Sequence, residues 1–200
     1  MLEHETIGVY KAYLKTHLSK KRYQHSLNVA VEAVRLADRY GIDRDKAYVA
    51  GLLHDAAKEA DPALQKSLTE ASPLDVSDVE KSAFPLYHAI AGAQLVQSAL
   101  GVTDAEIVSA IRYHTVARAG MSGLEQIIYL ADLISVDRDY RDVKRMRRIA
   151  FDDLGAAMYE ALKFALTDDV AKMNTIPPSK LAAYNEYTAR IKKARSKEAL

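Results

Sequence analysis

The sequence predicts an all-α fold built as one helical bundle. Apolar residues recur at three- and four-residue steps along most of the chain, which is the period of one helix face. Helix caps separate these segments, whereas no alternating β-type run or hairpin dipeptide stands out. With 200 residues, no linker-like stretch and no internal repeat, the chain is long enough to bury one core and is expected to form one domain.

The stretch from Lys20 to Tyr40 is predicted to be an amphipathic helix that ends at the C-cap residue Gly41. Its apolar face consists of Leu27, Ala30, Val31, Val34 and Ala37. Asp43 can cap the helix that follows. That second helix carries Ala47, Ala50, Gly51 and His54 on one side.

Proline and glycine mark the ends of the next elements. Asp61 and Pro62 begin a short helix, because an N-cap and a first-turn proline occur together there. Residues 71–84, with their serines and aspartates, are predicted to be the longest irregular connection. Pro85 then begins a helix that ends at Gly101.

Two capping boxes precede the remaining helices, one in residues 103–106 and one in residues 122–125. The second box leads into a core face formed by Leu124, Ile127, Ile128, Ala131 and Ile134. Pro177 and Pro178 begin a last helix, which ends in a basic stretch.

The composition limits the chemistry that the chain can perform. It contains no cysteine, so a bound metal must be held by His, Asp or Glu, and thiolate catalysis is excluded. The apolar runs are too short to cross a membrane and the N-terminus lacks a signal-peptide pattern, so we expect a cytoplasmic protein with no membrane contact. The basic residues near the C-terminus lack interleaved aromatics, which argues against nucleic-acid binding and favours a solvated helix face.

The histidines are the first candidates for a functional site. Those that lie on, or at the end of, separate predicted helices are His25, His54, His88 and His114. A single helical histidine is usually only a packed side chain, so the argument depends on the set. His4 and His17 lie among surface residues of the first segment and are assigned no specific role.

Two aspartates lie in apolar surroundings as well. Asp55 follows His54 directly in a stretch predicted to be helical, and a buried carboxylate is costly unless a cation or hydrogen bonds compensate it. Lys58 lies one turn beyond His54 and can face the same space.

The apolar stretch 127–134 contains the second of these aspartates, Asp132. A carboxylate there either pairs with an arginine, such as Arg138 or Arg141, or binds a metal together with the histidines. Taken alone, the residues leave both readings open.

The order of these residues resembles a known family. In chain order they are His25, His54, Asp55, His88, His114 and Asp132. This order resembles the HD superfamily of metal-dependent phosphohydrolases and, within it, the YqeK family of symmetrical bis(5′-nucleosyl)-tetraphosphatases, which split diadenosine tetraphosphate into two ADP. The matching stretches are residues 21–30, 51–58, 87–93, 111–115, 129–138 and 174–175.

The resemblance implies one HD domain over residues 1–200. Its core would cover about 20–184, with an N-terminal helix in 1–19 and a basic C-terminal helix or tail in 185–200 as extensions. The all-α fold would then be a single HD-domain helical bundle.

The resemblance also implies a role for each matching residue. The metal ligands would be His25, His54, Asp55 and Asp132, holding one or two divalent ions. The expected metal is iron, with manganese, cobalt, magnesium and zinc as alternatives. Catalytic roles would fall to Asp55, Lys58, His88 and His114. The nucleotide would contact Arg22, His25, Lys58, His88, His114, Asp132, Arg138 and Thr175.

Two alternatives to this function stay open at this point. Another HD nucleotide phosphohydrolase, acting on deoxynucleoside triphosphates or on guanosine tetraphosphate, would use the same metal residues, because specificity depends on the pocket walls. A non-catalytic helical module that binds nucleotides is the second. The partners expected are a small-molecule nucleotide and a second copy of the chain in a homodimer.

Overall fold

The computed structural model describes residues 4–198 and shows helices throughout, with no strand among them. The helices, in chain order, are α1 (His4–His17), α2 (Lys20–Tyr40), α3 (Arg44–Leu53), α4 (Pro62–Glu70), α5 (Asp78–Ser82), α6 (Tyr87–Ser98), α7 (Ala105–Tyr113), α8 (Gly123–Ile134), α9 (Val143–Asp152), α10 (Leu154–Ala171) and α11 (Pro178–Glu198). A short 3₁₀ turn, Phe84–Leu86, precedes α6. The predicted all-α class is confirmed.

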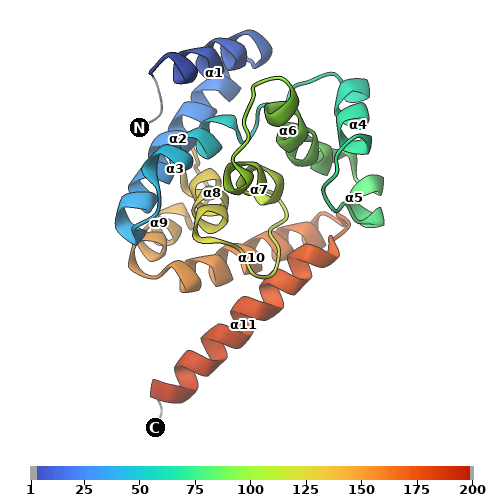
Figure 1. Ribbon diagram of the computed structural model, residues 1–200. Coiled ribbons are helices and arrows are strands. Elements are labelled where there is room, and N and C mark those ends of the chain that lie inside the picture. The colour runs from blue at the N-terminus through green and yellow to red at the C-terminus, as the bar shows by residue number, and fades with distance from the viewer. Residues whose placement is uncertain (1–3, 199–200) are drawn as a thin grey trace.

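The centre of the molecule is a bundle of α2, α3, α7 and α8 (Figure 1). Helix α2 packs against α3 and α8, while α7 packs against α3, α6 and α8. Helix α4 covers α6 on one side, and α9 and α10 close the other side against α8. The fully buried side chains in the middle include Leu36, Leu52, Leu53, Ile127, Ile128 and Ile134.

Helices α2 and α3 approach so closely at Gly51 that their backbones touch. A Cβ atom added at Gly51 would lie 2.9 Å from the Cα of Ala30 and 3.1 Å from the carbonyl oxygen of Val29. Only glycine fits there without moving one of the helices. This close approach fixes the height of His25 on α2 relative to His54 at the end of α3.

Most predicted helix ends agree with the structure. The side chains of Ser19 and Asp43 accept hydrogen bonds from the backbone at the starts of α2 and α3. Gly41 ends α2 with a φ of 66°, in the left-handed region that favours glycine. The capping box Ser122–Glu125 is present at the start of α8.

Other details of the sequence prediction were wrong. Residues 71–84 are not entirely irregular, because Ser77 and Glu80 form a capping box that begins α5. In the predicted box of residues 103–106, Asp104 rather than Thr103 caps α7, since its carboxylate reaches the backbone of Glu106. Val31 is 56% exposed, so it lies outside the core face of α2.

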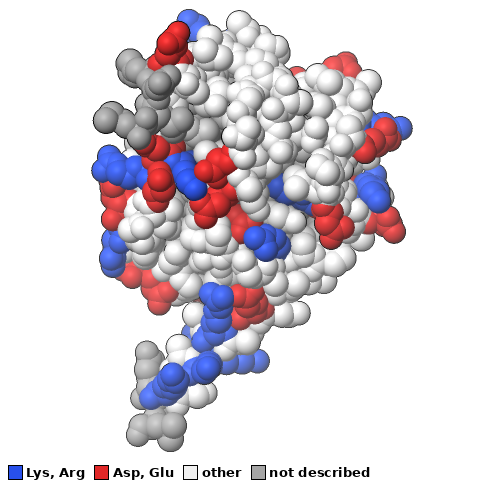
Figure 2. Space-filling view, in the orientation of Figure 1, with Lys and Arg blue, Asp and Glu red and all other residues white. Residues whose placement is uncertain are grey.

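Helix α11 leaves the body of the protein and projects from it (Figure 1). Its first half packs on α10, and Ala183 and Tyr187 are buried there. Lys and Arg side chains gather along the projecting half (Figure 2), where they are exposed to solvent as predicted. No helix in residues 4–198 is long and apolar enough to cross a membrane. Residues 1–3 and 199–200 and the side chains of His4 and Glu198 lie outside the described part.

Candidate metal centre and active site

The histidines and aspartates singled out in the sequence meet at one place in the bundle. His25 lies in the second turn of α2, His54 and Asp55 follow the last residue of α3, and His88 begins α6. His114 follows the last residue of α7, and Asp132 lies near the end of α8. The rings of His25 and His114 lie 5.3 and 5.0 Å, centroid to centroid, from the ring of His54.

The local conformation of the His54-Asp55 pair differs from the prediction. The pair was expected within a helix, but α3 ends at Leu53 and residues 54–59 form turns. Ending the helix here turns the pair toward the centre of the bundle. His54 is fully buried and Asp55 is 3% exposed.

Backbone carbonyls fix the orientation and the tautomer of three histidines. The Nδ1 atom of His54 lies 2.7 Å from the Gly51 carbonyl, that of His114 lies 2.7 Å from the Ile111 carbonyl, and that of His88 lies 2.8 Å from the Pro85 carbonyl. A carbonyl oxygen only accepts hydrogen bonds, so each Nδ1 donates one. In the neutral ring, Nε2 then carries the lone pair, which has no hydrogen-bond partner among the described residues at His54 but lies near Lys58 or Thr115 at His88 and His114. All three lone pairs point into the centre.

His25 is oriented by a carboxylate instead. Its Nδ1 lies 2.7 Å from Oδ2 of Asp137, and the Asn28 side-chain amide donates to the other oxygen of Asp137 at 2.9 Å. A carboxylate behind a histidine is a common support for a metal ligand. Asp137 was not among the residues predicted from the sequence, although it lies within the matching stretch 129–138. The only signal was its place in that stretch.

Imidazole nitrogens surround Asp55 at distances slightly too long for hydrogen bonds. His54 Nε2 lies 3.4 Å from its Oδ2, and the Nε2 atoms of His88 and His114 lie 3.6 and 3.7 Å from its Oδ1. The buried Nε2 of His54 has no hydrogen-bond partner among the described residues. Lone pairs that face one another across such gaps repel unless a cation or a proton lies between them.

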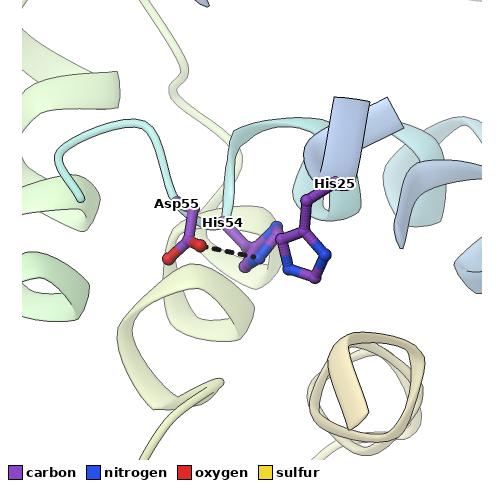
Figure 3. A group of neighbouring side chains, drawn as sticks. All are labelled: His25, His54 and Asp55. Atoms are coloured by element: carbon purple, nitrogen blue, oxygen red, sulfur yellow. Dashed lines mark ion pairs between the residues drawn. The ribbon is translucent and has the colours of Figure 1, made fainter. Parts of the chain in front are cut away.

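This arrangement fits a divalent metal ion. The ligand atoms fall into three overlapping groups, each within 4.8 Å: His25, His54 and Asp55; His54, His114 and Asp132; Asp55, His88 and His114. The first group appears in Figure 3, where the carboxylate of Asp55 and the ring of His54 point toward one another and the ring of His25 lies beside them. Nitrogen and oxygen donors of this kind suit iron, manganese, zinc and similar ions.

The charges of the centre perturb the pKa values of its members. Burial favours the neutral acid at Asp55, but His54 and His114 hold the pKa of Asp55 well below its usual range. Burial opposes protonation of His54, yet Asp55, Asp132 and the Gly51 carbonyl together outweigh burial and raise the pKa of His54. Burial, together with Lys58 and His114, lowers the pKa of His88 to about 3, so that ring is neutral.

Three cations border the centre. Arg22 Nη1 lies 2.8 Å from Oδ2 of Asp55, and Arg138 pairs with the side chain of Asp132. Lys58 Nζ lies 3.1 Å from Nε2 of His88, and burial lowers the pKa of Lys58. Asp132 therefore has the arginine partner considered from the sequence, Arg138, and also lies within reach of the histidines.

A cavity of about 450 Å³ opens onto this centre. Its lining includes the predicted residues Arg22, Asp55, Lys58, His88, His114, Asp132 and Arg138. Thr175, by contrast, is exposed and not among the lining residues, so its contact with the nucleotide stays a prediction.

Sequence analysis missed several residues of the cavity wall. Thr115 Oγ1 lies 3.0 Å from Nε2 of His114 and 3.2 Å from Nε2 of His88. Tyr140 and Phe164 stack with their ring centroids 5.0 Å apart. Nothing in the sequence connects these aromatics, because they come from a loop and from α10.

Comparison with known proteins supports the resemblance to the HD superfamily. The family model described as HD domain matches residues 22–137. A protein of Halalkalibacterium halodurans named bis(5′-nucleosyl)-tetraphosphatase, symmetrical, is 38% identical over 173 residues, which are 86% of this chain and 92% of that protein. A Bacillus subtilis protein of the same name is 36% identical over 176 residues, covering 87% of this chain and 93% of that protein.

A solved structure shares the fold as well. It is described as a predicted HD superfamily hydrolase involved in NAD metabolism from Clostridium acetobutylicum. It superposes with a TM-score of 0.88 at 32% identity, covering 95% of this chain and 99% of the other. The resemblance in the motifs is thereby confirmed, and the chain belongs to the HD domain family, in the branch formed by these bacterial relatives.

Proposed function

We propose that the chain is a metal-dependent hydrolase that cleaves diadenosine tetraphosphate, and related dinucleoside polyphosphates, symmetrically into two ADP. One observation carries this proposal: a centre of histidine and aspartate ligands and three cationic side chains meet at one cavity. The curated relatives named for this activity, each matched over more than nine-tenths of its length, support the substrate.

The resident metal would be held by His25, His54, Asp55 and Asp132, and we propose iron as the ion. Asp55, His88 and His114 form an overlapping group that would complete a second position. A bound divalent ion makes a coordinated water more acidic and polarises a phosphoryl oxygen. A homodimer and a cytoplasmic location are further parts of the proposal.

The cations of the cavity would bind the phosphate chain. Arg22 and Arg138 are held by Asp55 and Asp132, yet their side chains are 30% and 38% exposed, so unused N–H groups face the cavity. Arginine suits this role because its planar fork can bind two phosphate oxygens at once. Lys58 adds a point charge beside His88.

The reaction consumes one water and breaks one anhydride bond. The water oxygen forms a bond to one of the two middle phosphorus atoms, and the bond from that phosphorus to the central bridging oxygen breaks. The bridging oxygen leaves as part of the second ADP. In this proposal Asp55 would accept a proton from the water, and Lys58, which lines the same cavity, would offset the negative charge on the leaving oxygen.

The products of diadenosine tetraphosphate hydrolysis test the proposal. Purified protein loaded with iron or manganese should yield only ADP, and chelation should stop the reaction. ATP plus AMP would reject symmetrical cleavage, whereas turnover of deoxynucleoside triphosphates or guanosine tetraphosphate alone would favour another HD phosphohydrolase.

A further inference from the structure

A second cavity, of about 380 Å³, also borders the candidate metal centre, because His25 is among its lining residues. Its lining residues come from the start of α2, from Glu59 and from the loop after α8. Arg22, Arg138 and Tyr140 line both cavities, so the two adjoin at these side chains.

The candidate metal ligands divide between the two cavities. His25 lines the second cavity, whereas Asp55 and Asp132 line the first. His88 and His114 also line the first. The metal centre is therefore at the boundary, with space for a ligand on both sides of it.

The arginines that line both cavities suit a phosphate chain, and other residues of the second cavity suit a nucleoside. Arg22 and Arg138 at the boundary match a polyphosphate that passes from one cavity to the other. In the lining of the second cavity, the side chains of Lys21 and Asp139 are exposed and have no ion pair or hydrogen bond among residues 4–198. A free carboxylate can accept hydrogen bonds from ribose hydroxyls or from a base amino group.

Tyr140 lines both cavities and has an unused hydrogen-bond donor. Its hydroxyl is buried and has no hydrogen-bond partner among the described residues. One face of its ring is covered by Phe164 of the first cavity. A buried hydroxyl without a partner is unfavourable, and a ligand that accepts its hydrogen bond would remove the penalty.

We infer that the second cavity binds the other nucleoside diphosphate half of the substrate, so that the phosphate chain crosses the metal centre at its midpoint. This inference rests on the proposed function and deepens it. A substrate with a nucleoside at each end would then be cut between its two middle phosphates because each cavity holds one ADP-sized half.

The number of ADP molecules bound per chain tests the inference. The metal-loaded wild-type protein should bind two ADP at saturation, measured by equilibrium dialysis with labelled ADP. Lys21→Glu, which places a negative charge in the second cavity, should reduce this number to one and raise the KM for diadenosine tetraphosphate about tenfold.

Lys20→Glu is the matched control, because Lys20 is exposed, carries the same charge and lines neither cavity. It should bind two ADP and keep the wild-type KM. A single ADP on the wild-type protein, or equal effects of the two substitutions, would overturn the second site. Absence of turnover, or ATP plus AMP as products, would reject the proposed function instead. The product assay gives this result independently of the number of ADP molecules bound per chain.

Discussion

Helix α7 ends between two buried charged clusters that differ in how their charges are paired. One is the ion pair of Arg112 with Glu80 of α5, at 2.7 Å, in which both residues are at most 2% exposed. Arg112 also donates to the Asp75 carbonyl at 2.9 Å, and Ser77 donates to Glu80. The other is the metal centre, which His114 joins two residues further along the chain.

The difference is whether the chain compensates its own charges. Glu80 receives an arginine and the capping donors of Ser77, so its carboxylate needs no ligand from outside, although Nε and Nη1 of Arg112 have no hydrogen-bond partner among the described residues. Around Asp55, three histidines whose Nδ1 atoms donate to backbone carbonyls turn their Nε2 atoms toward the carboxylate without hydrogen-bonding it, and the Nε2 of His54 has no hydrogen-bond partner in residues 4–198. Burial of charge alone therefore does not indicate a functional site. Histidine nitrogens that converge on a buried carboxylate without hydrogen-bonding it do indicate such a site.

Removing a metal ligand should have the largest effect. His54→Ala is expected to lower the turnover of diadenosine tetraphosphate on the order of 1,000-fold, equivalent to about 4 kcal/mol, because the ion is lost. Steady-state kinetics and metal analysis of the purified variant measure this. His17→Ala, at an exposed histidine of α1, should keep both activity and metal; wild-type turnover and metal content in His54→Ala would break the assignment.

Breaking the Arg112–Glu80 ion pair should lower the stability of the protein and leave its catalytic rate unchanged. Glu80→Gln leaves Arg112 as a buried charge without its counterion and is expected to cost about 3–5 kcal/mol of unfolding free energy. Urea unfolding measures the loss, and the kcat per folded molecule should stay at the wild-type level. A double variant, Glu80→Leu with Arg112→Met, should recover much of the stability, since the unpaired charge is gone. If Glu80→Gln instead lost metal, the two clusters would not be independent.

Changing Asp137, the carboxylate that orients His25, should have an intermediate effect on metal binding. Asp137→Asn keeps the size of the side chain but weakens its grip on Nδ1 of His25, so metal affinity should fall about 10–100-fold. Competition with a fluorescent chelator measures this affinity. Asp139→Asn, two residues on and without contact to His25, is the control and should leave metal affinity unchanged.

The sequence predicted the metal centre better than the pair that stabilises α5. His25, His54, His88 and His114 stood out as a set on separate predicted helices, and Asp132 as a carboxylate in an apolar stretch. Arg112 and Glu80 gave no such signal, since surface charges are common and their pairing joins distant segments. The capping box of α5 was present in the sequence, but the surrounding serines and aspartates were read as a loop. Asp137 and Tyr140 act through contacts that only the folded chain creates.

The smallest effect is expected at Asp104, the partly exposed N-cap residue of α7. Asp104 caps α7 and pairs with Lys46; despite its partial burial, Lys46 and the backbone amides lower the pKa of Asp104. Asp104→Ala should cost about 1 kcal/mol at neutral pH. Because the folded pKa is depressed, this stabilisation is present above the unfolded pKa and is lost as pH falls below about 4. Thermal unfolding of both proteins from pH 7 to pH 3 measures the difference, and a gap that persists at pH 3 would contradict it.

The shift in thermal unfolding on adding a divalent ion tests the central claim most directly. An ion that binds only the folded protein raises the unfolding midpoint in proportion to the logarithm of its concentration. We predict this rise for the wild-type protein and for the Glu80→Leu/Arg112→Met variant, and its absence in His54→Ala. An equal rise in all three proteins would show that the ion binds elsewhere and would contradict the assignment of the centre.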